Sequence, residues 1–148
     1  MLRCVFPLVM AVGCAALYAC PDEEKLYDGK LQVKTIKVQS VTDDNSPIKY
    51  PDTDKPLVTT LRIHTLPGAG TGWHYHPHPG YAYVISGTME VTMESGRKNH
   101  YETDQAIYEL VNTPHNGRCV SETPCDLIVT FIGAENEPVT VMLPQHDD

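Results

Sequence analysis

Two short histidine-bearing segments carry the residue types that bind transition metals. The first, GWHYHPHPG, contains His74 and His76, and the second, TPHNG, contains His115. In a β-strand, residues two apart point to the same face, so the first two imidazoles can reach one cavity. His115 could supply a third nitrogen from another strand, as a divalent ion requires. The alternative is a histidine pair that lies on the surface and binds nothing.

The chain around these histidines has the pattern of short β-strands separated by turns. Apolar alternation or short apolar runs predict strands at residues 31–41, 58–64, 81–85, 89–93, 106–111, 127–132 and 139–143. Residues 112–117, which include His115, have the composition of a turn. Strands of this kind at intervals of about 8–12 residues are typical of a β-sandwich or barrel. No segment has helical periodicity, so the predicted fold class is all-β.

The histidine segments resemble the two motifs of the cupin family. Gly68, His74, His76 and Gly87 match positions of the first motif, and His115 matches the histidine of the second. The runs TGWHYHPHPGYAYVISG and ELVNTPHNGR resemble a group of small exported cupins. This resemblance implies a double-stranded β-helix, the jelly-roll barrel of cupins. It also implies a three-histidine site for one divalent ion (Fe, Mn, Ni or Zn).

Three positions depart from the family pattern. Gly80 stands where the family has a glutamate that usually binds the metal, Cys119 replaces an asparagine, and Asp104 lies near the place of a glycine. A glycine has no side chain to bind a metal, so the site has open positions for water or substrate, or else it binds metal poorly. If residue 80 faces the cavity, Gly80→Glu would restore the fourth ligand.

Two further residues are candidates for this site. His78 has the same parity as His76 and could replace the missing glutamate, although Pro77 and Pro79 disturb a regular strand. The alternative is a loop residue at the mouth of the cavity. Glu109 precedes His115 on the adjoining strand and could accept a hydrogen bond from an imidazole as a second-shell residue. The alternative is an ordinary strand carboxylate.

The chain divides into a leader, a lead-in and a main domain. Residues 1–19 begin with Arg3 and continue as an uncharged run, which predicts a signal peptide. The run LYAC resembles a lipoprotein signal with Cys20 as the lipidated residue, although ordinary signal cleavage remains an alternative. Residues 20–54 are predicted as a lead-in strand and loop, and residues 55–143 as the cupin domain. The protein is therefore expected to be periplasmic or secreted.

Cys119 and Cys125 are predicted to form a disulfide. The five residues between them read as a hairpin loop, which brings flanking strands within bridging distance. An exported protein meets conditions in which disulfides form. The alternative is a pair of free thiols, with Cys119 near the metal cavity.

The charge and the predicted site limit the classes of partner. The net charge is −8, which argues against nucleic acid as a partner. We expect a small-molecule ligand or substrate, membrane attachment only through a lipid on Cys20, and, from the resemblance, a homodimer. The predicted function is a metal-dependent small-molecule enzyme; the alternative is a non-enzymatic periplasmic protein that binds a metal or small ligand. No catalytic residue is assigned.

Overall fold

The computed structural model describes residues 31–144. The predicted signal peptide, residues 1–19, and Cys20 lie outside this range. The chain separates into two units, Met1–Thr35 and Ile36–Asp148, and the second contains all the strands found in residues 31–144. No helix in the described range is long and apolar enough to cross a membrane.

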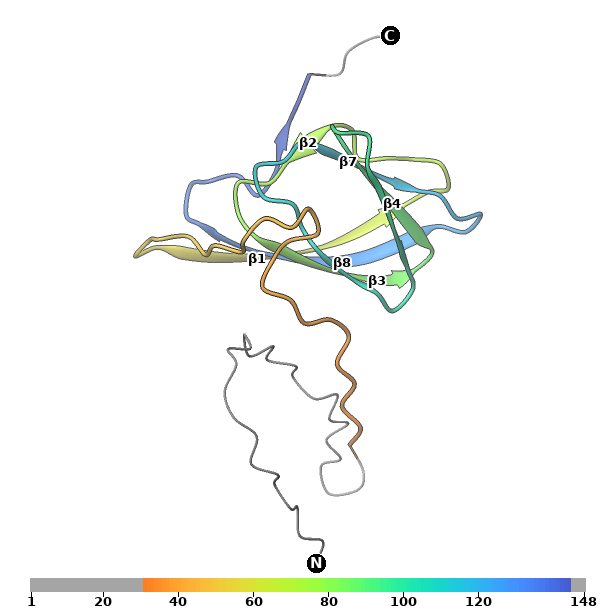
Figure 1. Cartoon of the computed structure of the whole chain (residues 1–148), viewed down its shortest axis with the longest axis horizontal. Helices are drawn as coiled ribbons and strands as arrows, with labels where there is room; N and C mark the ends of the chain where they lie inside the picture. Colours follow the sequence, from red (N-terminus) through yellow and green to blue (C-terminus); the bar gives the residue numbers. More distant parts are fainter. Residues whose placement is uncertain (1–30, 145–148) are drawn as a thin grey trace, which may run out of the picture. The chain divides into compact units, whose positions relative to one another are not determined.

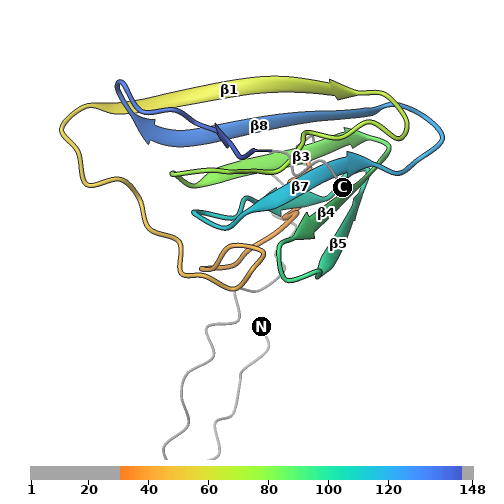
Figure 2. The ribbon, with the colours of Figure 1, turned by 90° about the horizontal axis from the view of Figure 1, so that it is seen from above.

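The described part of the chain is all-β, as predicted, with nine strands and no helix. In chain order these are β1 (Pro56–Thr65), β2 (His74–Tyr75), β3 (Gly80–Ser86), β4 (Thr88–Met93), β5 (Lys98–Glu102), β6 (Ala106–Tyr108), β7 (His115–Cys119), β8 (Cys125–Ala134) and β9 (Val141–Met142). They form two antiparallel sheets with strand orders β1-β8-β3-β6 and β5-β4-β7-β2-β9. Figures 1 and 2 show the two sheets facing each other.

The core lies between the two sheets because their inward positions are apolar. On β4, Met89, Val91 and Met93 are buried at alternate positions. Strand β8 buries Leu127, Val129 and Phe131 from the opposite sheet in the same way. This period of two is the sequence signal for strands with one face on a core.

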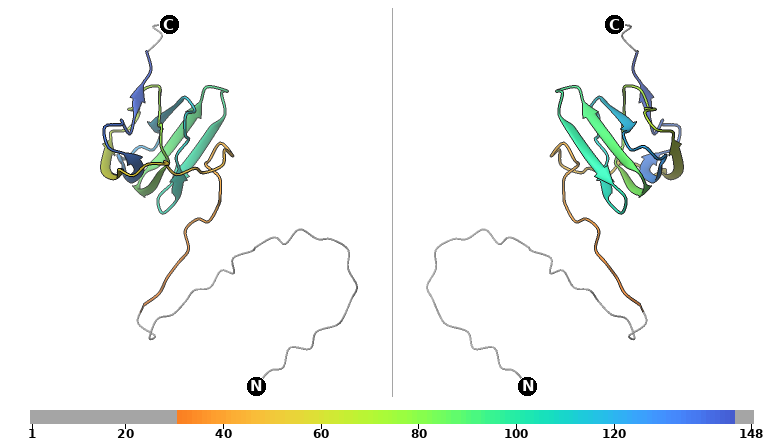
Figure 3. Two further views of the ribbon diagram at one scale, coloured as in Figure 1. Left: turned by 90° about the vertical axis from the view of Figure 1, so that its left-hand side faces the viewer. Right: turned by 90° about the vertical axis from the view of Figure 1, so that its right-hand side faces the viewer.

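The prediction of a strand at residues 31–41 is wrong for residues 36–41, which lie in the second unit. Residues 36–41 belong to neither sheet, and Val41 forms only an isolated bridge with Pro47. Side chains hold this segment instead. Asp43 accepts hydrogen bonds from Lys37 Nζ (2.5 Å) and from Tyr101 Oη of β5 (2.7 Å). In Figure 3 the orange segment that precedes β1 passes beside the sheet that contains β5.

Cys119 and Cys125 meet where β7 leads into β8. Cys119 and Cys125 are fully buried, their Cα atoms lie 5.8 Å apart, and their sulfur atoms are at disulfide distance. This is the pairing that the sequence predicts.

Candidate metal centre

Strand register brings His74 and His115 together. They are direct partners in the antiparallel pairing of β2 with β7, and their ring centroids lie 4.4 Å apart. Side chains at such opposed positions lie on the same face of the sheet. His76 follows directly after β2, where it forms a bridge with Val111. The predicted same-face spacing of His74 and His76 is therefore realised at the end of a very short strand.

Each of the three imidazoles is fixed by a backbone carbonyl. His74 Nδ1 donates to the Gly72 oxygen at 2.9 Å, and His115 Nδ1 donates to the Thr113 oxygen at 2.8 Å. His76 Nδ1 donates to the Val139 oxygen at 2.7 Å. A carbonyl can only accept, so Nδ1 carries the proton and Nε2 keeps its lone pair. This tautomer is the one that binds a metal through Nε2.

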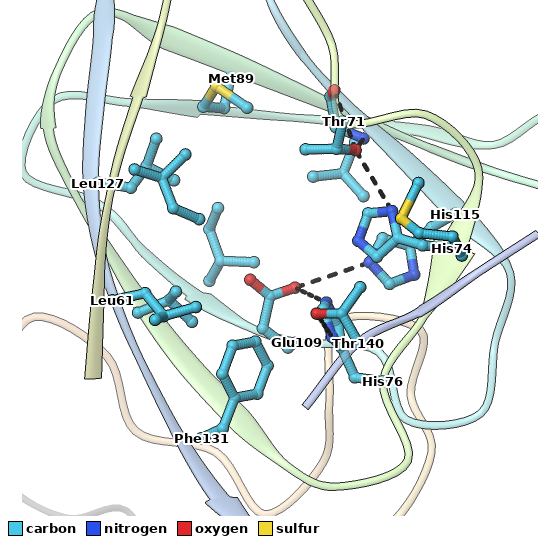
Figure 4. Close-up of a pocket in the computed structure, with 16 residues that line it drawn as sticks. Leu61, Thr71, His74, His76, Met89, Glu109, His115, Leu127, Phe131 and Thr140 are labelled. Carbon is cyan, nitrogen blue, oxygen red and sulfur yellow. Dashed lines mark hydrogen bonds and ion pairs between the residues drawn. The ribbon is translucent and has the colours of Figure 1, made fainter. Parts of the chain in front are cut away.

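The three free nitrogens converge. All three histidines are buried, and their potential ligand atoms lie within 4.8 Å of one another. In Figure 4 the three rings gather at one side of a pocket. Neutral imidazoles that converge in this way form a donor set suited to divalent zinc, iron, nickel or manganese.

The surroundings keep these histidines neutral. Burial lowers the pKa of His74, and it lowers the pKa of His76 to about 3 and that of His115 to about 4. The carbonyl hydrogen bonds act in the opposite direction but are outweighed. A metal does not have to displace a proton from any of the three near neutral pH.

A carboxylate completes the group. Glu109 Oε2 lies 3.9 Å from Nε2 of His76 and 3.9 Å from Nε2 of His115 (Figure 4). Its side chain is only 13% exposed. Burial, with a smaller contribution from the charge of Asp43, raises the pKa of Glu109 to about 7. This carboxyl can hold or release a proton near neutral pH.

Glu109 occupies the space beside the glycine at the usual glutamate position. The two residues are neighbours across β3 and the end of β6, where the Glu109 amide donates to the Gly80 carbonyl at 2.9 Å. A Cβ at Gly80 would lie 3.0 Å from Glu109 Cγ and 2.5 Å from Phe131 Cε1. Residue 80 does face inward, but Phe131 and Glu109 fill the room that Gly80→Glu would need. The carboxylate thus comes from the adjacent strand.

His78 lies apart from the three-histidine group. Its Nε2 is 2.5 Å from Glu137 Oε2, and its ring packs where Gly133 has no side chain. Two other histidines also pair with acidic residues at the surface: His64 with Asp126 and His100 with Glu90.

A cavity of about 140 Å³ extends from the histidines into the space between the sheets. Thr71 and Thr140 add hydroxyl groups at the histidine end, and the remaining walls are largely apolar. A site with a polar end and apolar walls is typical of small-molecule pockets.

A family model described as the cupin domain matches residues 61–131. The match includes all four residues that converge at the site. The chain therefore contains a cupin domain with the double-stranded β-helix fold. Among curated proteins, none matches the chain.

Solved structures share this fold at low sequence identity. A structure of the DMSP lyases RdDddP and RnDddQII is 22% identical with a TM-score of 0.51, over 59% of this chain and 44% of the other. Oxalate decarboxylase from Bacillus subtilis is 23% identical with a TM-score of 0.50, over 58% and 24%. An oxalate oxidase is 20% identical with a TM-score of 0.50, over 59% and 46%. The aligned region spans less than half of each of these chains.

Proposed function

We propose that the protein binds one divalent transition-metal ion through His74, His76 and His115 and catalyses a metal-dependent reaction of a small molecule. The observation that carries this proposal is the convergence of three neutral imidazoles at the end of a cavity. Each imidazole is held in the tautomer that leaves Nε2 free. The fold is shared with enzymes that act on small molecules, and the assignment of function rests on the site rather than on the fold.

A bound divalent ion would supply Lewis acidity toward an oxygen atom of the substrate. The chain supplies the remaining functions. Three backbone carbonyls fix the imidazoles, so the donor atoms are positioned before any ligand enters. Apolar side chains of both sheets exclude water from the inner end of the cavity.

Glu109 has two roles open to it. Its Oε2 atom is close enough to the histidine nitrogens to join them as an oxygen ligand after a small movement. If it remains unbound, a carboxyl with a pKa near 7 can take a proton from the substrate or return one. Metal affinity of a Glu109→Gln variant tests the first role, because loss of a carboxylate beside the ion weakens binding.

Metal analysis of protein purified without a polyhistidine tag tests the proposal. We expect about one equivalent of divalent ion after incubation with iron, manganese, nickel or zinc. His76→Ala should lose this ion, whereas His100→Ala, which removes an exposed histidine outside the site, should retain it. A wild-type protein that takes up none of these ions would contradict the proposal. Turnover of a candidate substrate by the loaded protein then distinguishes an enzyme from a binding protein.

Export is a second, separate proposal. We infer that residues 1–19 are removed on export and that Cys20 is the site of lipid attachment if the leader is of the lipoprotein type. The pairing of Cys119 with Cys125 at disulfide distance supports an oxidising compartment. Cell fractionation with mass spectrometry of the mature N-terminus tests this. An unprocessed N-terminus in the cytosolic fraction would contradict it.

A further inference from the structure

The cavity has only one polar end. Away from the histidines its walls are formed by six buried apolar side chains from both sheets: Met89, Val91, Ile107, Leu127, Val129 and Phe131. In Figure 4, Leu127 lies across the cavity from the histidine rings, with the Glu109 carboxylate between, whereas Phe131 packs beside His76 at 4.6 Å between ring centroids. A bound molecule must therefore present one polar group to the histidines and an apolar group to the opposite wall.

Within residues 31–144, no lysine or arginine side chain lines this cavity. Lys37 is bound to Asp43, and the Arg118 guanidinium donates to the Gly68 carbonyl, both outside the lining. Glu109 is the cavity's one acidic lining residue. A second anionic group on the ligand would be buried against apolar walls and a carboxylate, without a counter-charge. Burying an unpaired charge in this way is strongly unfavourable.

The entrance is also apolar. Leu61 on β1 and Met142 on β9 line the cavity and are 38% and 56% exposed. Both strands are at the edges of their sheets, so the cavity opens between β1 and β9. A ligand that enters here passes two apolar side chains.

We propose that the site selects small monocarboxylates with a short apolar tail and discriminates against dicarboxylates. The inference rests on the proposed metal function. A cavity of about this volume holds a molecule of the size of benzene, roughly six heavy atoms, and butanoate has that size. Its carboxylate would lie at the histidine end, and its methyl group would lie against Leu127.

Titration of the manganese-loaded protein with two matched acids tests this selectivity. Succinate is butanoate with a second carboxylate in place of the terminal methyl group. Binding is followed by calorimetry and by the change in the Mn²⁺ electron paramagnetic resonance spectrum. We expect butanoate to bind at least about tenfold more tightly than succinate, because the second charge has no partner. From acetate to propanoate to butanoate, affinity should rise roughly fourfold per methylene group.

A charge introduced at the entrance provides a matched pair of variants. Leu61→Arg places a cation at the cavity mouth and should shift the preference toward succinate. Val58→Arg adds the same charge to the same strand at a side chain that is 62% exposed and outside the cavity lining, and should leave the preference unchanged. Metal content is measured first in every variant.

Three results overturn the inference. They are succinate binding to loaded wild type as tightly as butanoate, no binding of either acid to the loaded protein, and no gain in affinity along the acid series. In each of these the metal is bound, so the proposed metal function stands. A protein that takes up no metal overturns the proposed function and this inference with it.

Discussion

His74 on β2 and His115 on β7 are directly opposed residues of one antiparallel pair, and each donates from Nδ1 to the carbonyl two residues earlier in its own segment. Pairing fixes the distance between the two backbones, and the carbonyl bonds fix the ring orientations. Because the register of a short strand determines this arrangement, the two imidazoles are positioned as a unit before a metal binds.

Removal of either opposed histidine should therefore abolish tight metal binding. We expect His74→Ala and His115→Ala each to lower the affinity for divalent metal by at least roughly 100-fold, more than outer-shell changes cost. Competition with a chromogenic chelator measures the affinity. His64→Ala removes a surface histidine that pairs with Asp126 and serves as the control. Wild-type affinity in either site variant would show that the metal binds elsewhere.

Glu109 is expected to contribute to metal affinity. Because Oε2 lies 3.9 Å from two of the free nitrogens, Glu109→Gln should weaken Mn²⁺ binding by about 10–100-fold. Glu90→Gln is the matched control, since Glu90 pairs with Lys98 and His100 at the surface and should not affect binding. Equal affinities for both variants would leave Glu109 with a role in proton transfer alone.

Gly80 is expected to be required for packing. A Cβ at this position would lie 2.5 Å from the Phe131 ring, so Gly80→Ala should lower the free energy of unfolding by about 1–3 kcal/mol. Gly80→Glu should lower the free energy of unfolding further, and it should not restore a fourth metal ligand. Gly117→Ala is the control, because its Cβ would meet Met89 at an ordinary 3.5 Å. Urea denaturation measures the stabilities of Gly80→Ala and Gly117→Ala. Equal stabilities would mean that the Phe131 ring can move aside.

Apolar alternation predicted the strands that face the core. The predicted ranges 58–64, 89–93 and 127–132 fall within β1, β4 and β8. Strand β7 was predicted as a turn because its inward positions are held by histidine, glycine and cysteine, which give only a weak apolar signal. Strand β5 was missed because it lies at a sheet edge and buries only Tyr101.

The three histidines could be predicted from spacing and family resemblance, and Glu109 could be named as a candidate neighbour, but the position of its carboxylate beside Gly80 could not be derived. Whether residue 109 points inward beside Gly80 depends on the register of β3 with β6, which joins residues far apart in the sequence. A glycine at a position that usually carries a ligand was the available signal. It indicated that a side chain was missing, without indicating which strand would supply a replacement.

The cysteine pair gives a prediction about stability. A bridge between Cys119 and Cys125 closes a short loop, so the double variant Cys119→Ser/Cys125→Ser should lose at most about 2–3 kcal/mol of unfolding free energy. Adding a reductant should destabilise the wild type and leave the double variant unchanged. Non-reducing mass spectrometry of the protein isolated from its host cells gives the direct test. Two free thiols in freshly isolated material would contradict the bridge.

Asp44 links the lead-in to the segment that carries His115. Its Oδ2 accepts from Thr113 Oγ1 at 2.6 Å, and Oδ1 accepts from the Ser46 amide at 3.0 Å. Burial raises the pKa of Asp44, but hydrogen bonds from Thr113, Thr42 and Ser46 outweigh it and lower the pKa to about 2.

Because that pKa is below the ordinary value of 3.8, the folded state favours the ionised form of Asp44. Its contribution to stability is complete above about pH 4 and is lost as the pH falls toward 2. Asp44→Asn should therefore be less stable than wild type at pH 6, and the difference should shrink between pH 4 and pH 2. Denaturant titrations across this range measure it, with Asp52→Asn, an exposed lead-in carboxylate, as the control. A stability difference between wild type and Asp44→Asn that stays constant with pH would mean that Asp44 stabilises the fold through packing rather than through its charge.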